Sequence, residues 1–360
     1  MYDVIIIGAG PGGIFSAYEL MKQDENLKIA VFDAGRSLEQ RHCPIDGEKV
    51  KNCIGCKTCA IMNGFGGAGA FSDGKYNITN DFGGTLEEME QDYFRYQCEE
   101  TPLLSYQFGF HAEYTTSRNL MEGIAQLAGK YKKPVYVHCS ETKREVEECR
   151  EKTGMTPIAY MDSLGLFENG GGLFHGVHLD EADFDIMKKK KICVVTNPAS
   201  NLKLASGIAP VKTYLEKGIP VAIGTDGPAS NNCLDMFKEM FLVTGLQKVV
   251  HNDPEAVPAA DVLKMATVNG AYAMGLDNCD ILAEGKYADL IMIDLMQPNM
   301  QPIQNIEKNV VYSASKLNVK MTMINGRAVY QNGKFKIGES VEDIYENANR
   351  IAERILDGKE

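Results

Sequence analysis

The sequence has little positive charge. Lys and Arg together number 37 against 49 Asp and Glu, so the 360-residue chain carries a net charge of −12. A protein that binds nucleic acid or an anionic membrane surface needs clustered Lys and Arg, because these side chains displace the counterions of the phosphates. The charge balance therefore predicts neither nucleic acid nor an anionic membrane surface as a partner.

Long hydrophobic runs are also missing. No stretch approaches the roughly 20 apolar residues that span a bilayer, and the first ten residues lack the basic start of a signal peptide. Hydrophobic residues make up 44 % of the chain, which is enough for a core in one large or two medium domains. Ten cysteines without a secretory signal indicate a reducing compartment, so we expect a cytoplasmic protein.

The N-terminal segment has the pattern of a dinucleotide-binding βαβ unit. A β-branched run at 3–7 leads into a glycine-rich turn and a helical pattern, and the apolar run at 29–32 ends in Asp33. The turn contains three glycines at GxGxxG spacing, namely Gly8, Gly10 and Gly13. These glycines permit the tight turn, the approach of a pyrophosphate and close helix–strand packing, while the acidic residue accepts a bond from ribose. We therefore predict a Rossmann-like nucleotide site here.

A cysteine cluster and a second glycine-rich loop follow. The cysteines are Cys43, Cys53, Cys56 and Cys59, and the loop spans 64–75. CxxCxxC spacing suits a zinc or iron–sulfur site, but a set of idle thiols explains it equally well. With the βαβ pattern, these stretches resemble the opening of a family of FAD-dependent dehydrogenases. The resemblance ends near residue 84 and implies FAD as cofactor, so we expect a truncated FAD/NAD(P)-binding piece over 1–87.

From residue 104 onward, short apolar runs alternate with amphipathic helical patterns. The runs expected as strands are 106–110, 135–138, 172–178, 192–196 and 221–225. The patterns expected as helices are 118–131, 143–152, 181–190 and 208–217. Such alternation predicts an α/β fold with a parallel sheet, as in a TIM-type (β/α) barrel, whose active residues stand at the carboxyl ends of the strands.

The polar residues with catalytic chemistry stand at those strand ends. They are His111, His138 with Glu141, His175 with His178, Asn197 with Asn201, and Asp226. A single His at a strand end is more often a packed core residue, but three successive ends with His and a last end with Thr-Asp-Gly favour a zinc site. Bound zinc lowers the pKa of water to about 7 and so supplies a nucleophile.

The segments around these residues resemble S-adenosylhomocysteine/5′-methylthioadenosine deaminases of the amidohydrolase superfamily. The resemblance rests on 111–115, 138–142, 175–179, 197–205 and 224–232 and covers most of 94–355. It implies that His138 and Asp226 bind a divalent metal such as Zn²⁺, that Glu141 shuttles protons to the purine and that His175 polarises the attacking hydroxide. His111 would contact the substrate, a small purine nucleoside, whereas we expect a structural role for His178.

One family motif is absent. The resemblance implies an HxH pair on the first barrel strand, yet no two of the six histidines stand two positions apart. Only five barrel strands are predicted where eight close a barrel. We therefore expect an incomplete metal-dependent hydrolase barrel over 94–278, β-sandwich strands over 279–338 and a C-terminal helix over 339–360.

The sequence reads as two partial genes joined near 85–95, a chimera that holds its metal weakly. Three hypotheses stay open at this point: a deaminase with a reduced site, an FAD-dependent oxidoreductase fragment, and a composite without activity. Oligomerisation is also left open by the sequence.

Overall fold

The computed structural model describes residues 2–7, 11–24, 26–33, 86–96 and 103–356 of the chain. The chain divides into two compact units, one made of Met1–Lys75 with Glu339–Glu360 and the other of Tyr76–Gly338. Each unit is described by itself below. None of the described helices is both long enough and apolar enough to cross a membrane.

The described part of the first unit contains two strands and two helices. Strand β1 (Val4–Ile7) pairs in parallel with β2 (Ile29–Phe32), and helix α1 (Pro11–Gln23) connects them. Helix α13 (Val341–Leu356) lies within 339–360, the range in which a C-terminal helix is expected from the sequence. Gly8, Gly10 and the cysteine cluster lie outside the described residues, so a Rossmann-like nucleotide site stays a prediction.

The second unit is built on a parallel sheet of five strands. Their order is β3 (Phe108–Phe110), β4 (Val135–Cys139), β5 (Gly171–His175), β6 (Ile192–Thr196) and β7 (Val221–Ile223), and every pair is parallel. Sequential neighbours in the chain are neighbours in the sheet, as in a TIM-type barrel. Within the described ranges β3 and β7 each pair on one side only, so they form the two edges of this sheet.

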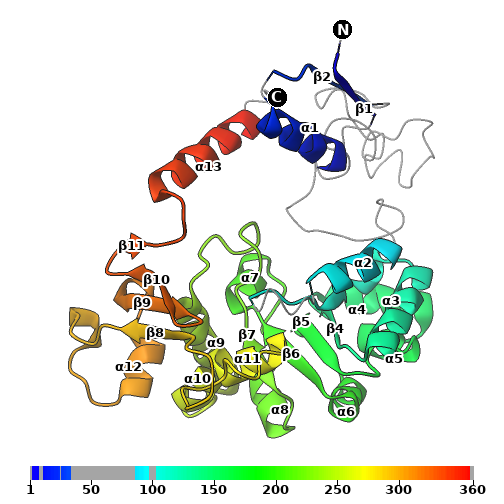
Figure 1. Ribbon diagram of the computed structural model, residues 1–360. Coiled ribbons are helices and arrows are strands. Elements are labelled where there is room, and N and C mark those ends of the chain that lie inside the picture. Colours follow the sequence, from blue (N-terminus) through cyan, green and yellow to red (C-terminus); the bar gives the residue numbers. More distant parts are fainter. Residues whose placement is uncertain (1, 8–10, 25, 34–85, 97–102, 357–360) are drawn as a thin grey trace. The chain divides into compact units, whose positions relative to one another are not determined.

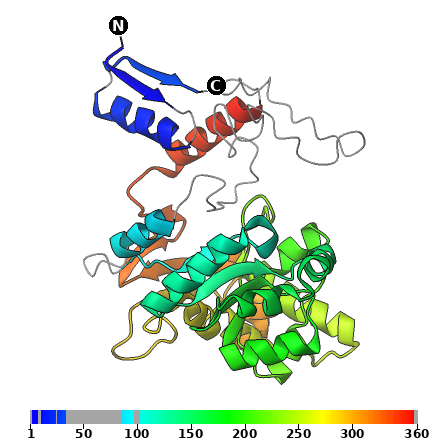
Figure 2. The same ribbon diagram turned by 90° about the vertical axis from the view of Figure 1, so that its right-hand side faces the viewer.

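Helices connect the strands and cover one face of the sheet. They are α3 (Arg118–Tyr131), α4 (Lys143–Thr153), α5 (Pro157–Ser163), α6 (Glu181–Lys190), α7 (Pro198–Lys203), α8 (Val211–Glu216) and α9 (Met236–His251). In Figure 1, α3, α4 and α5 lie together beside β4, and Figure 2 gives the view from that side. Buried apolar side chains from strands and helices join in one core, to which Val135, Leu173 and Val194 contribute from three successive strands.

Local sequence signals explain where several of these helices begin and end. Thr142 accepts a hydrogen bond from the backbone N–H of Glu145, whose carboxylate bonds back, so the two form a capping box at the start of α4. Asp180 and Asp183 form the same arrangement at the start of α6. Gly154 ends α4 in the left-handed conformation with φ 77°, which costs glycine no side-chain clash.

The opposite face of the sheet carries a second, smaller set of buried side chains. Cys193 and Ala222 pack there with Ala273 of helix α11 (Val268–Met274), and Tyr136 and Val195 adjoin them. The Tyr136 hydroxyl donates a hydrogen bond to the Ala273 carbonyl. Helix α11 therefore covers this face near the amino ends of the strands, while the carboxyl ends extend beyond it.

A smaller antiparallel sheet follows in the same unit. Its order is β11 (Lys334–Phe335), β10 (Arg327–Gln331), β9 (Val319–Ile324) and β8 (Leu290–Ile293). The remaining helical segments are α2 (Leu86–Tyr96), α10 (Ala259–Ala266), α12 (Ile306–Tyr312) and the short 3-10 turns Glu113–Thr115, Pro298–Met300 and Lys316–Asn318. A sandwich of two layers at this place stays a prediction.

Candidate metal centre

Three strand ends bring two imidazoles and a carboxylate together. His138 is the second-last residue of β4, His175 is the last residue of β5, and Asp226 follows β7 by three residues. One ligand atom from each lies within 4.8 Å of the others. Glu141 joins them, with its Oε2 3.6 Å from His175 Nε2, and Asp226 Oδ2 lies 3.9 Å from the same nitrogen. The four residues that the sequence places at successive strand ends thus share one pole of the sheet.

The backbone bends sharply at this pole. Ser140, His175 and Asp226 have φ values of 53°, 73° and 60°, in the left-handed region that costs non-glycine residues energy. His175 is fully buried, with 0 % of its surface exposed. Surrounding contacts must hold these conformations, and they turn the side chains of the strand ends toward one another.

Both histidine rings are oriented through Nδ1. The Nδ1–H of His138 donates to the backbone carbonyl of His111 at 2.9 Å, because a carbonyl can only accept. His175 Nδ1 lies 2.7 Å from the side-chain oxygen of Asn201, a residue of α7 that is 1 % exposed. Such outer partners fix the ring of a metal-binding histidine and select its tautomer.

Asp226 is held as an anion. Ser200 donates its hydroxyl to Asp226 Oδ2 at 2.6 Å. Burial alone would raise the pKa of Asp226, but the bonds from Ser200 and the backbone of Gly227, with the nearby His175 and His138 rings, lower it below its usual value. An ionised carboxylate is therefore present to bind a cation.

Glu141 is fixed by contacts on both sides of it. The Ser206 hydroxyl donates to its Oε1 at 3.0 Å, which leaves Oε2 directed toward His175. The turn that carries it is held by Glu145, whose carboxylate accepts the N–H groups of Ser140, Glu141 and Thr142 at 2.6, 2.8 and 3.3 Å. Burial of Glu145 raises its pKa to about 7 despite these three donors.

A buried carboxylate also braces the segment that carries Asp226. Glu239 of α9 is 0 % exposed and accepts the N–H of Ala199 at 2.9 Å and the amide of Asn231 at 2.8 Å. The same amide nitrogen of Asn231 donates to the carbonyl of Thr225, also at 2.8 Å. Glu239 thereby links the residue before Ser200 to the residue before Asp226.

The donor set fits a divalent metal. His175 Nε2 is buried and has no hydrogen-bond partner among the described atoms, yet two carboxylate oxygens lie within 4 Å of it. Ligands about 2.0–2.2 Å from one tetrahedral zinc stand about 3.4 Å apart, close to these separations. Two imidazoles and a carboxylate are a frequent zinc ligand set, so His138, His175 and Asp226 can hold such an ion.

The other histidines of the motifs lie beside the group. The His111 ring centre is 5.0 Å from that of His138, and its Nδ1 lies 3.0 Å from the Thr115 hydroxyl. His178 donates its Nε2–H to the carbonyl of Ser206 at 2.7 Å. This bond fixes the segment that holds Glu141, in keeping with a structural role for His178.

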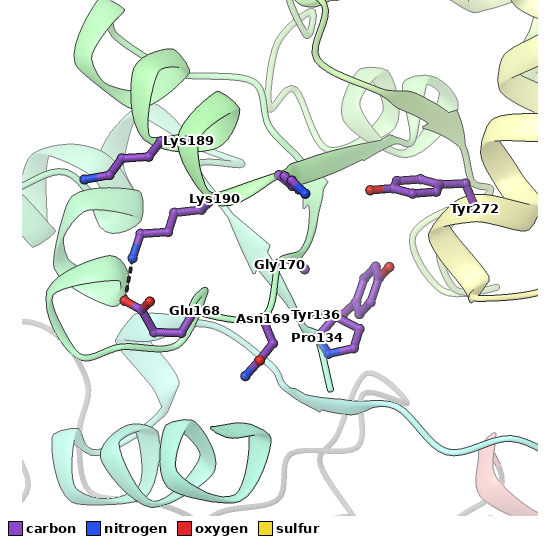
Figure 3. Close-up of a pocket in the computed structure, with 10 residues that line it drawn as sticks. Pro134, Tyr136, Glu168, Asn169, Gly170, Lys189, Lys190 and Tyr272 are labelled. Carbon is purple, nitrogen blue, oxygen red and sulfur yellow. Dashed lines mark hydrogen bonds and ion pairs between the residues drawn. The ribbon is translucent and has the colours of Figure 1, made fainter. Parts of the chain in front are cut away.

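A roomier cavity lies at the other end of the same strands. It has a volume of about 550 Å³, and its lining includes Lys189, Lys190, Tyr136 and Tyr272. Figure 3 shows the two lysines on one side and the two tyrosines on the other, with Lys190 paired to Glu168 at 2.5 Å. None of the four residues that converge at the carboxyl ends lines it.

A comparison of the sequence with protein families shows the family of this chain. The Amidohydrolase family matches residues 80–329. The chain belongs to the amidohydrolase family. The predicted superfamily is thereby confirmed, whereas nothing in these comparisons bears out an FAD-dependent dehydrogenase at the N-terminus of this amidohydrolase.

Named relatives of this amidohydrolase are adenosine-type deaminases. It is 39 % identical to a 5-methylthioadenosine/S-adenosylhomocysteine deaminase of Dictyoglomus thermophilum over 79 % of this chain and 67 % of the relative. It is 41 % identical to a 5′-deoxyadenosine deaminase of Methanothermobacter thermautotrophicus over 64 % of this chain and 54 % of that protein. The chain thus spans about half to two thirds of the length of these relatives.

A solved structure shows the same fold. An adenosine deaminase from Xanthomonas campestris with bound zinc superposes with a TM-score of 0.72 at 33 % identity, over 76 % of this chain and 62 % of that one. This likeness agrees with the α/β fold and its parallel sheet, as expected for a TIM-type barrel of the amidohydrolase family.

The sequence did not single out the residues that hold the centre in place. Ser200 and Ser206 bond the central groups, Glu145 and Glu239 bond the backbone beside them, and the sequence shows Asn201 only as a residue after a strand. The capping pattern of Thr142 with Glu145 was the one local signal that could have pointed to such a residue.

Proposed function

We propose that this chain carries a metal-dependent deaminase centre for adenine nucleosides, of the S-adenosylhomocysteine or 5′-methylthioadenosine type. The observation that supports it most directly is the convergence of His138, His175 and Asp226 around one point, with Glu141 beside them. The names of the relatives and of the zinc-containing neighbour agree with this reaction class.

The residues have separate tasks in this proposal. His138 and Asp226 hold the metal, which when bound lowers the pKa of a water toward about 7. Glu141 Oε2 faces the centre while Ser206 holds its other oxygen, so the carboxylate can take a proton from water and give it to the purine ring nitrogen. His175 and Asp226 orient the attacking oxygen, and His111 contacts the substrate.

We further propose that the activity is low in this chain. Catalytic zinc sites have three protein ligands as a rule, and the HxH pair that the resemblance implies is absent from the sequence. With only His138 and Asp226 as assigned ligands, the ion is bound weakly and the pKa of its water falls less. The purified protein should therefore contain less than one zinc per chain.

A zinc-reconstituted sample incubated with S-adenosylhomocysteine, 5′-methylthioadenosine and adenosine tests the reaction. We expect slow formation of the inosine-type product, followed by chromatography, and no product from Glu141→Gln. The exposed Glu181→Gln is the matched control and should keep the wild-type rate. No product from the metal-loaded wild-type protein would overturn the proposal.

A second candidate rests on the first unit. The parallel pair β1–β2 with α1 between its strands is the arrangement that the sequence predicts for binding an ADP moiety of FAD through Gly8, Gly10, Gly13 and Asp33. Calorimetric titration with ADP and FAD checks this. Binding that Gly10→Val abolishes would support it, and no binding at millimolar ligand would exclude it.

A further inference from the structure

The amide of Asn201 meets His175 in a fully enclosed place. His175 and Asn201 are 0 % and 1 % exposed, and Asn201 Oδ1 lies 2.7 Å from His175 Nδ1. Neither His175 Nε2 nor Asn201 Nδ2 has a hydrogen-bond partner among the described atoms. A buried polar atom without a hydrogen-bond partner costs free energy. Two such atoms occur here in the two residues that share one hydrogen bond, so the arrangement needs an explanation.

The amide can select between two forms of the neutral ring. With Oδ1 toward the ring, Nδ1 must carry the hydrogen and Nε2 presents a lone pair. With the amide reversed, Nδ2 would donate to Nδ1 and Nε2 would carry the hydrogen. The structure has Oδ1 toward the ring.

The surroundings of Nε2 agree with the lone-pair form. The nearest carboxylate oxygens, of Glu141 and Asp226, lie 3.6 and 3.9 Å away. Both separations exceed the 2.7–3.2 Å range of an N–H···O bond, so a hydrogen on Nε2 would find no acceptor at bonding distance. A cation between the lone pair and the carboxylates would satisfy all three groups.

We propose that Asn201 is a positioning residue that holds His175 in its Nδ1–H form and so makes Nε2 a third metal ligand beside His138 and Asp226. This inference rests on the proposed metal centre and changes the assignment of His175 within it. A ring with Nε2–H could only donate to an attacking water, whereas a ring with a free Nε2 binds the metal itself. The third ligand would partly replace the absent HxH pair.

Two successive residues of helix α7 contact the two groups directly. Ser200 donates to Asp226 Oδ2 at 2.6 Å and Asn201 accepts from His175. The N–H of the preceding Ala199 is fixed by the buried carboxylate of Glu239 at 2.9 Å. One turn of helix therefore sets the orientation of an anionic and a neutral ligand together.

The ring form can be measured in the metal-free protein by two-bond ¹⁵N–¹H correlation of ring-labelled histidine. The chain contains its own references, because His138 bonds a carbonyl through Nδ1–H and His178 bonds one through Nε2–H. We expect the His175 pattern to match that of His138. A pattern that matches His178, or one with both ring nitrogens protonated, in the wild-type protein would overturn the inference, whatever the outcome of the activity assay.

Substitutions then test the link to the metal. Asn201→Asp keeps an acceptor toward Nδ1 and should retain the ring form and the zinc affinity. Asn201→Leu removes it and should weaken zinc binding 10- to 100-fold, the usual loss for an outer partner of a ligand, as measured by competition with a chromophoric chelator. Asn269→Leu removes an amide bonded to the Val221 carbonyl at 2.7 Å and is the matched control, which should leave affinity unchanged.

The outcomes separate this inference from the proposed function. Zinc that binds equally well to wild type and Asn201→Leu would refute the role of Asn201 while leaving the deaminase centre standing. Loss of zinc in Asn201→Leu together with a change of the His175 ring form would support the role even in a protein without turnover.

Discussion

The two ends of the parallel sheet differ in how tightly their side chains are packed. At the carboxyl ends the polar groups are buried and paired, and Ser140, His175 and Asp226 keep left-handed conformations. At the amino ends the structure leaves a cavity of about 550 Å³ lined by lysines and tyrosines. The crowded end holds the groups with metal chemistry, and the roomy end holds ion pairs with partly exposed members.

The contrast shows that the cavity and the group of potential metal ligands lie at opposite ends of the strands. A ligand group of defined geometry needs side chains locked by neighbours, since a freely moving imidazole or carboxylate loses its orientation. The carboxyl ends supply such neighbours from α4, α7 and α9, whereas Lys190 at the other end relies on Asp162 and Glu168 at 3.2 and 2.5 Å. The contrast can be tested by substitutions at each end.

The largest effect is expected for Asp226→Asn. In the proposed centre this change removes an ionised oxygen ligand. Loss of an outer partner costs 10- to 100-fold in affinity, so loss of the ligand should weaken zinc binding more than about 100-fold. Chelator competition measures it. Asp185→Asn, on the exposed side of α6, is the control and should keep the wild-type zinc affinity. Equal zinc affinity in the two variants would contradict metal binding at the carboxyl ends of the strands.

Glu145 should give the carboxyl end a pH dependence. Its pKa is raised to about 7 by burial, from a usual value of 4.5. Protonated Glu145 therefore contributes its full share to the free energy of unfolding below about pH 4.5. This contribution is lost as the pH rises through about 7, a change on the order of 3 kcal/mol. Thermal unfolding of the wild type and of Glu145→Gln from pH 5 to 8 tests this. The difference between their unfolding midpoints should change with pH, because only the wild type loses the contribution of protonated Glu145. Midpoints that follow the same pH dependence in both proteins would contradict it.

Gly172→Ala should displace Tyr136, which lines the cavity at the amino ends of the strands. A Cβ on Gly172 would lie 2.2 Å from Cε1 of Tyr136, so the ring must move and the bond from its hydroxyl to Ala273 is strained. We expect a loss of about 1–3 kcal/mol in unfolding free energy from denaturant titration, with unchanged zinc affinity. Gly129→Ala, in α3 with no atom within 4 Å, should instead gain about 0.5–1 kcal/mol.

The smallest effect is expected for Lys190→Ala. It forms one ion pair with Asp162 and one with Glu168, and the Glu168 side chain is 63 % exposed, so water screens much of that second attraction. The unfolding free energy should fall by less than about 1 kcal/mol, with no change in zinc affinity by chelator competition. A loss of zinc binding on this substitution would mean that the two ends are coupled.

The sequence predicted the parallel sheet well because its strands are short apolar runs bounded by polar or glycine residues. β6 was predicted at its observed bounds, and α3 and α6 likewise. The predicted runs extended too far at 172–178 and 221–225, where the strands end at His175 and Ile223. The first strand ends at a positive φ, at His175, and the second is followed by one three residues later, at Asp226; apolar periodicity reveals neither.

The candidate site was predictable for the groups at strand ends and not for their supports. Parallel strands place their carboxyl ends at one edge, so topology alone brings His138, His175 and Asp226 near one another. Ser200, Asn201 and Glu239 reach them from helices α7 and α9, and those contacts depend on how the helices pack rather than on spacing along the chain. The roles of all these residues in catalysis stay predictions.

The carbonyl of His111 holds His138 through two bonds. It accepts both the backbone N–H and the ring N–H of His138 at 2.9 Å, so the neighbouring strand fixes the histidine through main-chain atoms. This support does not depend on the side chain at position 111, because any residue supplies the same carbonyl. If His111 contacts the substrate as proposed, a substitution at position 111 can change that contact while the backbone keeps the orientation of His138.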